Sequence, residues 1–564
     1  MASTKEKVEP QIEPDVERAD ATVEITREPT NDVPFSIYTH KQKIAIVLTA
    51  STAGFISPMT GAIYLPALNS VAADLHVSNT LINLTLTTYL IFQGLAPTFV
   101  GAFSDSAGRR PAYLICIVLW VAANIGIALQ DNYTALLVLR CLQSSGSSGL
   151  IAIANAIVAD IVPSAERGTY IAYASVGSIL GPSLGPFIGG ILSQYAGWRW
   201  IFWFLTIFGC VLFTPIFLFF PETCRKIVGN GSIPPPPLNH TLMTWLHEKK
   251  LKKEGRQDLF EERDRLAATR HITFPNPMLT LRIIFSKTAC IALFAAGVLF
   301  SCYYAITSSI PTEFRAGYHL DDFQISLLYL PFGVGSLISA FTTGRFMDWN
   351  FRRHAKREGI EVIKNKQTDL SNFPIEKVRL EVYIPAVSIG AIGMLCYGWV
   401  VAERVSIAAP CVFLFLAGYS LTAGFNCMNI LLVDLYPGKP ATATAANNLV
   451  RCWMGAGAAA AVIPLINAIK FGPTVTLAAG IWISFTPILL ILVKKGPRWR
   501  REAAAKEMEK VAADEVKDTE KAKRKEMKQA ARDAKGKEEM LQSPVDEKDD
   551  EKEDEKEIAG IPKA

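Results

Sequence analysis

The stretch GAFSDSAGRR at residues 101–110 returns in the second half of the chain as GRFMDWNFRR at residues 344–353. Both copies keep a glycine, an aspartate and two adjacent arginines at the same offsets, namely Gly101, Asp105, Arg109 and Arg110, and Gly344, Asp348, Arg352 and Arg353. A second pattern, Asp-x-x-Pro, begins at Asp160 in the first half and at Asp434 in the second. These paired polar patterns predict an internal duplication of one structural unit.

The segments around these patterns are strongly apolar. Half of the 564 residues are hydrophobic, and only 19% are charged, against about 25% in soluble proteins. The mean hydropathy is +0.24 even though residues 498–564 are mostly Lys, Glu, Asp, Arg and Ala. A helix that crosses a bilayer needs about 20 apolar residues. Twelve runs of about that length occur, at 44–63, 81–103, 113–129, 135–157, 170–192, 200–220, 289–310, 325–347, 382–401, 408–432, 444–468 and 475–493.

The runs predict an all-α membrane protein with twelve transmembrane helices in two pseudo-symmetric six-helix halves. Two parallel repeats with a site at their interface form a secondary transporter that opens alternately to each side of the membrane. Five segments follow from the run boundaries. They are a polar N-terminal tail at 1–43, a six-helix bundle at 44–220, a central loop with a short amphipathic helix at 221–286, a second bundle at 287–495 and a charged tail at 496–564.

Basic residues gather in alternate connections, and the positive-inside rule therefore places both termini in the cytoplasm. The inner connections contain Arg109, Arg110, Arg167, Arg352, Arg353, Lys356 and Arg357, and the outer ones contain Arg199, Arg315, Arg404 and Lys470. The polar, acidic start has no apolar stretch typical of a cleaved signal peptide. We expect a multi-pass protein of the plasma membrane, with the vacuolar membrane as the alternative, glycosylated at Asn132.

Composition and motifs exclude several other functions. The net charge of +5 is a small difference between 57 basic and 52 acidic residues, so no nucleic-acid partner is indicated. The ten cysteines never form CxxC, and neither a metal-binding HExxH nor a phosphate-binding GxxxxGK[ST] occurs. We therefore expect no metal, no cofactor and no enzyme activity, and a chain that acts as a monomer in the lipid bilayer.

Further motifs resemble those of a known family. GAFSDSAGRRP resembles the signature loop of the major facilitator superfamily, RCLQSSG at 140–146 its fourth-span motif, and GSILGPSLGPFIGG at 177–190 the fifth-span motif of its exporters. With GWRWIFWF, PET, FMDWN, DLYPG and NNLVRC, the chain is similar to fungal twelve-span drug:proton antiporters, in particular the quinidine-resistance and citrate-exporter-like group. The similarity covers residues 43–493. It departs at Ser144, where the family usually has glycine, and this difference would loosen close helix approach.

The resemblance implies roles for the loop and the fifth span. The Gly, Asp and Arg residues of both loops would form the cytoplasmic gate, with each glycine allowing close helix contact. Alternatively, these residues only satisfy the positive-inside rule. In the fifth span, Gly177, Gly181, Gly185 and Gly189 form a stripe against which another helix can pack, and Pro182 and Pro186 should bend the helix. The exporter signature comprises Gly181, Pro182, Gly185 and Gly189, and tight packing with no role in direction is the alternative.

Two arginines lie within predicted spans, Arg140 and Arg451, whereas no Asp or Glu lies in the middle of any span. A charge there is costly, so both arginines must face polar groups or a cavity. Such a cavity should prefer anionic or neutral polar substrates. Alternatively, Arg140 is structural or coupling machinery and Arg451 reaches the cytoplasmic edge. The further residues predicted to line the cavity are Gln143, Asn447, Asn448, Asn426, Asn429, Gln93, Tyr303, Tyr304 and Thr307, with Asn447 on the same helix face as Arg451.

These features predict an exporter of small organic molecules such as drugs, toxins or secondary metabolites. The resemblance implies coupling to protons, although no buried carboxylate or histidine supplies an obvious carrier. A dedicated exporter of citrate or a similar polycarboxylate is the alternative. A substrate-sensing receptor built on a transporter body is a third candidate, but the C-terminal tail is only moderately long for a sensor. That tail alternates Lys and Glu, which predicts a solvated helix or a disordered extension.

Overall fold

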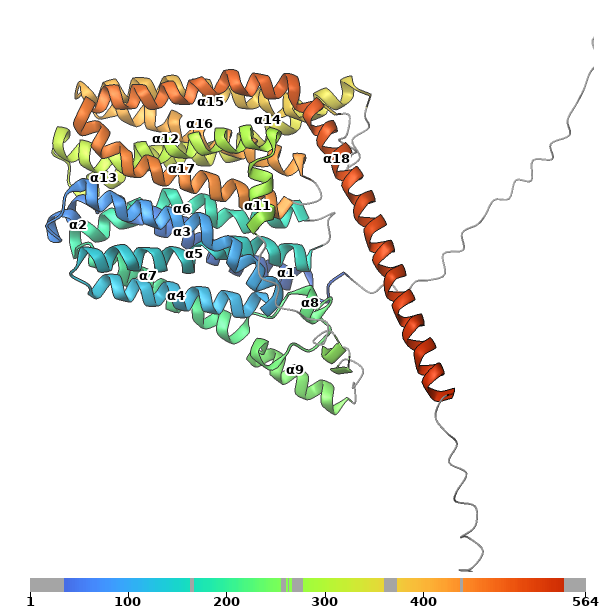
Figure 1. Cartoon of the computed structure of the whole chain (residues 1–564). Helices are drawn as coiled ribbons and strands as arrows, with labels where there is room; N and C mark the ends of the chain where they lie inside the picture. Colours follow the sequence, from blue (N-terminus) through green and yellow to red (C-terminus); the bar gives the residue numbers. More distant parts are fainter. Residues whose placement is uncertain are drawn as a thin grey trace, which may run out of the picture.

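The computed structural model of the protein describes residues 35–162, 167–254, 260–261, 263–265, 277–359, 373–436 and 440–541. These described residues are almost entirely helical, and the long helices lie side by side in one bundle (Figure 1). Ten of the twelve apolar runs fall wholly within long helices, the run at 200–220 extends one residue past its helix, and the run at 325–347 is divided between a short helix and a long one. This confirms the predicted all-helical fold. The prolines of the two Asp-x-x-Pro patterns, Pro163 and Pro437, lie outside the described residues.

The first half of the bundle contains six long helices and one short helix. They are α1 His40–Ile63, α2 Leu68–Asp74, α3 Asn79–Ala107, α4 Arg109–Leu129, α5 Tyr133–Ile161, α6 Arg167–Ala196 and α7 Arg199–Phe219. The short α2 was not predicted from the sequence, because its seven residues are too few to stand out among apolar runs. The described part of the central connection adds α8 Arg225–Val228, a 3₁₀ turn at Pro237–Asn239, α9 Leu242–Lys253 and α11 Pro277–Ile284.

The second half repeats the arrangement of the first. Its helices are α12 Lys287–Tyr318, α13 Asp322–Leu327, α14 Tyr329–Arg357, α15 Ile375–Ala402, α16 Ala408–Leu435, α17 Pro440–Ile469 and α18 Phe471–Leu541. The predicted run 325–347 is divided between α13 and α14. The last span and the described part of the charged tail form one continuous helix, α18, of 71 residues, which extends away from the bundle (Figure 1).

Length and hydropathy identify the helices that can cross a membrane. Eleven helical segments in the described part of the chain are long and apolar enough, and α13 with α14 counts as one of them. The predicted fifth span lies in α6, a continuous 30-residue helix that runs through Pro182 and Pro186 and provides the twelfth span. The fold is therefore twelve transmembrane helices in two halves of six.

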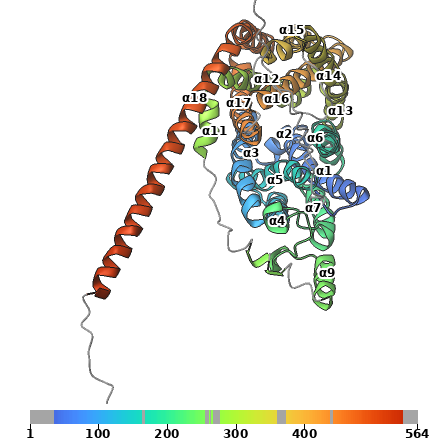
Figure 2. The same ribbon diagram turned by 90° about the vertical axis from the view of Figure 1, so that its right-hand side faces the viewer.

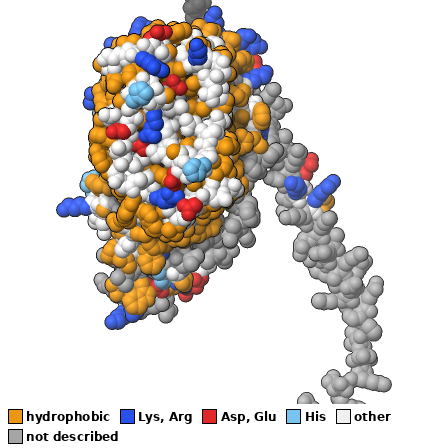
Figure 3. Space-filling model, turned by 90° about the vertical axis from the view of Figure 1, so that its left-hand side faces the viewer, with side chains coloured by type: hydrophobic (Ala, Val, Ile, Leu, Met, Phe, Trp, Pro, Cys, Tyr) orange, Lys and Arg blue, Asp and Glu red, His pale blue; other side chains and the backbone are white. Residues whose placement is uncertain are grey.

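The two ends of the bundle differ. The loop end carries α8, α9, α11 and the emerging α18, and the far end carries α2 and α13 (Figure 1). Viewed from the loop end, the helices of the first half and those of the second form two groups (Figure 2). The groups meet where α3 packs on α17 and where α6 packs on α13 and α14. Apolar side chains border the far end, and Lys, Arg, Asp, Glu and His side chains are scattered across that face (Figure 3).

The glycine stripe predicted in the fifth span lies against α1. A Cβ atom added to Gly177 would lie 2.2 Å from the Ser51 carbonyl oxygen, and one added to Gly189 would lie 1.9 Å from the Ile63 carbonyl oxygen. The backbones of α1 and α6 are therefore too close for side chains larger than hydrogen at these positions. This confirms the close helix approach that the stripe predicts.

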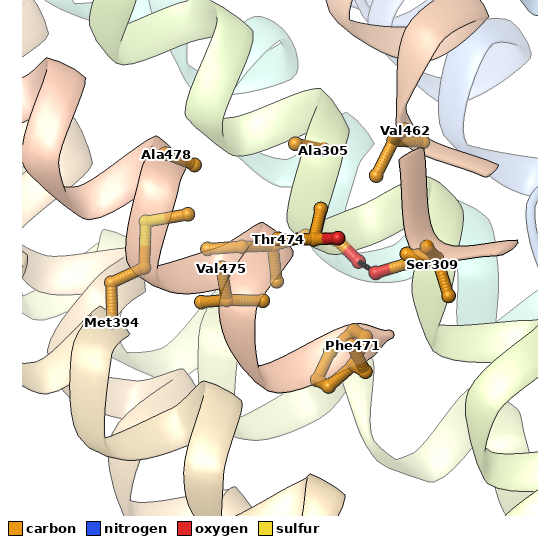
Figure 4. Close-up of a pocket in the computed structure, with 10 residues that line it drawn as sticks. Ala305, Ser309, Met394, Val462, Phe471, Thr474, Val475 and Ala478 are labelled. Carbon is orange, nitrogen blue, oxygen red and sulfur yellow. Dashed lines mark hydrogen bonds between the residues drawn. The ribbon is translucent and has the colours of Figure 1, made fainter. Parts of the chain in front are cut away.

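The second half is also closely packed. A small pocket of about 10 Å³, enough for the centre of about one water molecule, lies among α12, α15, α17 and α18 (Figure 4). Its lining is mainly apolar, with Met394 on one side and Val462 on the other. Ser309 lines it too, but its hydroxyl donates to the Ile306 carbonyl oxygen at 2.9 Å. The pocket is too small for a substrate, and we regard it as a packing gap.

Candidate functional site

The first intramembrane arginine is completely enclosed by protein. Arg140 on α5 is 0% exposed, and its guanidinium carbon lies 4.5 Å from the ring centres of both Tyr64 and Tyr89. One nitrogen donates to Gln143 Oε1 at 2.6 Å, as the one-turn spacing predicts. Within the described part of the chain, its Nε and Nη2 atoms have no hydrogen-bond partner. An arginine held between two aromatic faces keeps a cation–π attraction while part of its hydrogen-bonding capacity stays unused.

A polar chain continues from this arginine into the first half. Gln143 Nε2 donates to Asn124 Oδ1 at 2.7 Å, and Asn124 donates to the Trp120 carbonyl oxygen at 2.7 Å. Beside it, the Ser144 hydroxyl donates to the Tyr89 carbonyl oxygen at 2.6 Å. The residue that departs from the family pattern therefore joins α5 to α3 instead of loosening their contact. These bonds fix the orientation of the Arg140 side chain.

The second intramembrane arginine is only half-buried. Arg451 on α17 donates to Asn448 Oδ1 at 2.8 Å, and its guanidinium lies 5.0 Å from the Phe300 ring and 4.8 Å from the Phe425 ring. Asn448 in turn donates to the Gln93 carbonyl oxygen at 3.0 Å, which links the two halves. Arg451 therefore lies near the interface between the halves.

Asn447, which shares a helix face with Arg451, is not its hydrogen-bond partner. Its Nδ2 lies 3.5 Å from the Asn429 Oδ1 on α16, and the i−3 residue Asn448 accepts from the guanidinium instead. Asn426 on α16 is half-buried, like Asn429.

An aromatic cluster on α12 lies in the same region. Tyr303 lies 4.9 Å from Tyr304 and 5.4 Å from Phe332, and Phe300 lies 5.0 Å from Tyr304, measured between ring centres. A Cβ atom added to Gly61 on α1 would lie 3.7 Å from the Tyr304 hydroxyl oxygen, so this ring reaches the first half. Thr307 is buried, and its hydroxyl donates to the Tyr303 carbonyl oxygen. The two arginines are thus each bordered by rings.

Neither arginine is neutralised by a carboxylate. Among the described residues, no ion pair involves Arg140 or Arg451. The sequence contains no Asp or Glu near the middle of any span. The region around the interface therefore carries positive charge, as predicted from the sequence.

At the loop end, the first signature loop forms an ion-pair cluster. Arg109 bonds Asp105 at 2.5 Å and Asp160 at 2.8 Å, and it also donates to the Ser104 hydroxyl. Asp105 is thus paired with the arginine that follows it by one helical turn. All of these partners lie in the first half, so in this conformation the cluster braces that half and does not bridge the two halves.

A different carboxylate holds the start of α4. Glu222, which is 2% exposed, accepts hydrogen bonds from the backbone N–H groups of Arg109 at 2.8 Å and Arg110 at 3.2 Å. It also accepts from Asn239 Nδ2 at 2.6 Å, which ties the central connection to the bundle. Its negative charge therefore lies at the N-terminus of α4, where a carboxylate is favourable. The sequence signal for this residue is the PET motif after the sixth span.

The second signature loop does not reproduce these contacts. Asp348, Arg352 and Arg353 are exposed, and none forms an ion pair with another described residue. Asp434, the counterpart of Asp160, pairs instead with Arg379 on α15 at 3.0 Å. The matching offsets therefore do not produce matching contacts, because α15 supplies its own arginine one helical turn after its start.

The glycines of the two loops also differ from expectation. A Cβ atom added to Gly101 or to Gly344 would meet no atom within 4 Å. The prediction that these glycines allow close helix contact was therefore wrong. Gly108 is the constrained glycine instead, because its φ is +114° and an added Cβ would lie 2.4 Å from Glu222 Oε2. Gly181 and Gly185 pack on α1 with Pro182 between them.

The predicted glycosylation site lies at the far end. Asn132 is exposed and caps α5, since its Oδ1 accepts from the Thr134 backbone N–H at 2.8 Å.

The hydrogen bonds that join described residues of the two halves are unevenly distributed along the bundle. They lie at the far end and near the middle, and none lies at the loop end.

Comparison with known proteins places these features in a family. The model of the Major Facilitator Superfamily matches residues 50–460. The MFS-type transporter phiD from a fungal species is 48% identical over 496 residues, which cover 88% of this chain and 74% of that protein. Citrate exporter 1 of Aspergillus niger is 34% identical over 475 residues, covering 83% of this chain and 88% of that protein.

A solved structure supports the same fold. The xylose transporter XylE from E. coli, in a partially occluded inward open conformation, matches with a TM-score of 0.54 at 13% identity, covering 80% of this chain and 99% of that chain. The duplicated loops, the two six-helix halves and the fungal relatives agree with one another. The chain is a membrane transporter, not an enzyme, and it belongs to the Major Facilitator Superfamily.

Proposed function

We propose that the protein is a secondary active exporter that moves small organic molecules by alternating access. The site would lie between the halves, where the half-buried side chains of Arg451 and Asn448 meet the backbone of Gln93. The absence of bonds between described residues of the two halves at the loop end supports access from that side. With both termini in the cytoplasm, substrate would enter from the cytoplasm.

The substrate class follows from one observation: two intramembrane arginines have aromatic rings beside them and no carboxylate. An anionic or neutral polar group would bind Arg451, and apolar or aromatic parts of the substrate would lie against Phe300 and Tyr303. A lipophilic cation would meet the arginine's charge with no counter-ion. We therefore favour secondary metabolites or drugs that carry a carboxylate or a similar acidic group.

A small polycarboxylate such as citrate is the second candidate. The 34% identity to a protein named Citrate exporter 1 supports it. The surroundings of the arginines favour it less, because a trianion would present several carboxylates to one half-buried arginine and to rings. Arg140, at 0% exposure, would be reached only after Tyr64 or Tyr89 moved.

Coupling and location complete the proposal. A proton gradient across the plasma membrane would drive export, with the vacuolar membrane as the alternative site, and the protein would act as a monomer. In this scheme the gate at the loop end comprises the ion-pair cluster of Arg109 on one side and that of Arg379 on the other.

The test uses sealed proteoliposomes with an imposed pH gradient. Uptake of three labelled compounds is compared: phthalate as an aromatic dicarboxylate, citrate, and tetraphenylphosphonium as a lipophilic cation. The Arg451→Ala variant should lose about tenfold or more of carboxylate transport, the equivalent of one charge-assisted hydrogen bond. The Arg345→Ala variant, which removes an exposed arginine on α14, serves as the matched control and should transport normally.

Each outcome separates the candidates. Transport of phthalate over citrate, dependent on Arg451, supports the first proposal, whereas citrate alone supports the second. Gradient-driven uptake of the cation alone would overturn both and would return Arg451 to a structural role. Carboxylate uptake that does not depend on the imposed gradient would refute proton coupling while leaving the substrate class intact.

A further inference from the structure

A single aspartate at the far end collects hydrogen bonds from both halves. Asp322, the first residue of α13, is 2% exposed. Its Oδ2 accepts from the Ser70 hydroxyl of α2 at 2.6 Å and from the Ser193 hydroxyl of α6 at 2.5 Å. Its backbone N–H donates to Gln194 Oε1 at 3.2 Å. Three of the bonds that cross between the halves therefore converge on this one residue.

The charge of Asp322 is balanced from its own half. Arg315, near the end of α12, forms an ion pair with Oδ1. Since both members of this pair belong to the second half, the pair can persist when the halves move apart. Of the bonds that Asp322 makes, separation of the far end would break those with Ser70, Ser193 and Gln194. The carboxylate would then stay paired while becoming exposed to water, which limits the cost of opening.

The packing around Asp322 is equally close. A Cβ atom added to Gly190 on α6 would lie 2.2 Å from Ser326 Cβ and 2.7 Å from the Asp322 carbonyl oxygen. Nearby, Asn69 Nδ2 donates to the Pro311 carbonyl oxygen across the halves at 2.7 Å. No comparable bond joins described residues of the halves at the loop end. The far end is thus the closed end of this conformation, and Asp322 lies at its centre.

We propose that Asp322 is the positioning residue that latches the outer gate, holding the far end shut through Ser70, Ser193 and Gln194 until the substrate-loaded transporter opens outward. This inference rests on the alternating-access mechanism proposed above, but not on the identity of the substrate. Replacing the carboxylate by an amide removes the acceptor that serves both hydroxyls and places an N–H₂ group against Arg315. The equilibrium between the two conformations would then shift toward the outward-open state.

The experiment measures distances at both ends of the full-length protein by double electron–electron resonance. Spin labels are attached through a genetically encoded amino acid, which avoids the native cysteines. One pair joins positions 129 and 406 at the far end, and the other joins positions 226 and 357 at the loop end. In Asp322→Asn, the far-end distance should gain a longer component and the loop-end distance a shorter one.

The neighbouring residue gives a matched control. Asp321 caps α13 by accepting from the Gln324 backbone N–H at 2.8 Å, and asparagine caps a helix about as well as aspartate. Asp321→Asn removes the same charge one residue away and should leave both distance distributions unchanged. If Asp322→Asn fails to fold, the Ser70→Ala/Ser193→Ala double variant removes two crossing bonds while keeping the Asp322–Arg315 pair.

The reciprocal change separates a latch from a general structural role. A loosened fold would broaden both distributions without shortening the loop-end distance, and this result would overturn the proposal. Unchanged distances in Asp322→Asn, or equal shifts in the Asp321→Asn control, would overturn it as well. Because no substrate is added, failure of the substrate proposal in the transport assay leaves this result interpretable.

Discussion

Alanine substitutions along the glycine stripe of α6 should destabilise the protein in an order set by distance. Ordinary van der Waals contact begins near 3.4 Å, so the 1.9 Å between an added Cβ at Gly189 and the Ile63 carbonyl oxygen requires the two backbones to separate by about 1.5 Å. The corresponding distances are 2.2 Å at Gly177, 2.8 Å at Gly181 and 3.1 Å at Gly185. At all four positions the nearest atoms include backbone atoms of α1, which cannot rotate away.

The magnitude combines two opposing terms. Overpacking a close contact costs about 1–3 kcal/mol, and alanine gains about 0.8–1.0 kcal/mol over glycine in helix propensity. Gly189→Ala and Gly177→Ala, the closest contacts, should therefore be destabilised by up to about 2 kcal/mol, and Gly185→Ala should be close to neutral. Gly101→Ala and Gly344→Ala, where the new methyl group meets open space, should be neutral or slightly stabilising.

The assay is the thermal midpoint of the detergent-solubilised protein, read by fluorescence-detected size-exclusion chromatography. The six variants, four along the stripe together with Gly101→Ala and Gly344→Ala, are compared in one detergent at one protein concentration. The predicted rank, from least to most stable, is Gly189 and Gly177, then Gly181, then Gly185, then Gly101. If Gly189→Ala were as stable as Gly101→Ala, the close α1–α6 packing could not be what the stripe provides.

Three further predictions concern charged groups near the ends of the bundle. Glu222→Gln should reduce the free energy of unfolding by about 1–3 kcal/mol, and so lower the thermal midpoint, because an amide accepts fewer hydrogen bonds from the start of α4. Equal stability in Glu222→Gln and wild type would contradict this role. Asp434→Asn should lower the free energy of unfolding by about 2 kcal/mol because it leaves the buried Arg379 without its ion-pair partner. Asp348→Asn, at an exposed position, should not change the stability. The reverse result would indicate that the two signature loops make equivalent contacts. Hydrogen bonding from Trp198 and the nearby Arg199 hold the pKa of Asp74 below its usual value, so its stabilising effect is present at neutral pH and is lost as the pH falls through the lowered pKa. The difference in thermal midpoint between wild type and Asp74→Asn should therefore narrow below about pH 4, and a constant difference would refute the assignment.

The spans could be predicted because a bilayer imposes a length and a polarity that the chain must satisfy in each crossing. A charged side chain is costly inside a bilayer, which is why Arg140 and Arg451 could be predicted to lie beside polar groups or a cavity. The pairing of Arg140 with Gln143 followed from helical spacing. The stripe on α6 was predicted because four glycines at one spacing leave a smooth face. In each case a single helix carries the whole signal.

Contacts between helices could not be predicted in the same way. Arg379 replaces Arg352 and Arg353 as the partner of Asp434, because the rotation of α15 decides which side chain reaches the carboxylate. Asp322 went unnoticed because the sequence Leu-Asp-Asp-Phe-Gln reads simply as a helix start, which Asp321 indeed provides. Its bonds come from residues more than 120 positions away. Contacts between residues so far apart in the chain produce no periodic sequence pattern from which they could be predicted.

Because α18 is continuous, the described part of the C-terminal tail should move rigidly with the last transmembrane span. Residues 496–541 continue the last span for about 70 Å at 1.5 Å per residue, and Pro497 lies at the joint. Just beyond it, Arg500 donates to the Phe373 carbonyl oxygen at 2.7 Å and lies 3.8 Å from Glu376 Oε2, which stiffens the joint against α15. A rotation of the second half by roughly 10° would then sweep the distal end of the helix through about 12 Å. Small rotations of the second half inside the membrane would therefore produce larger displacements at the distal end of α18.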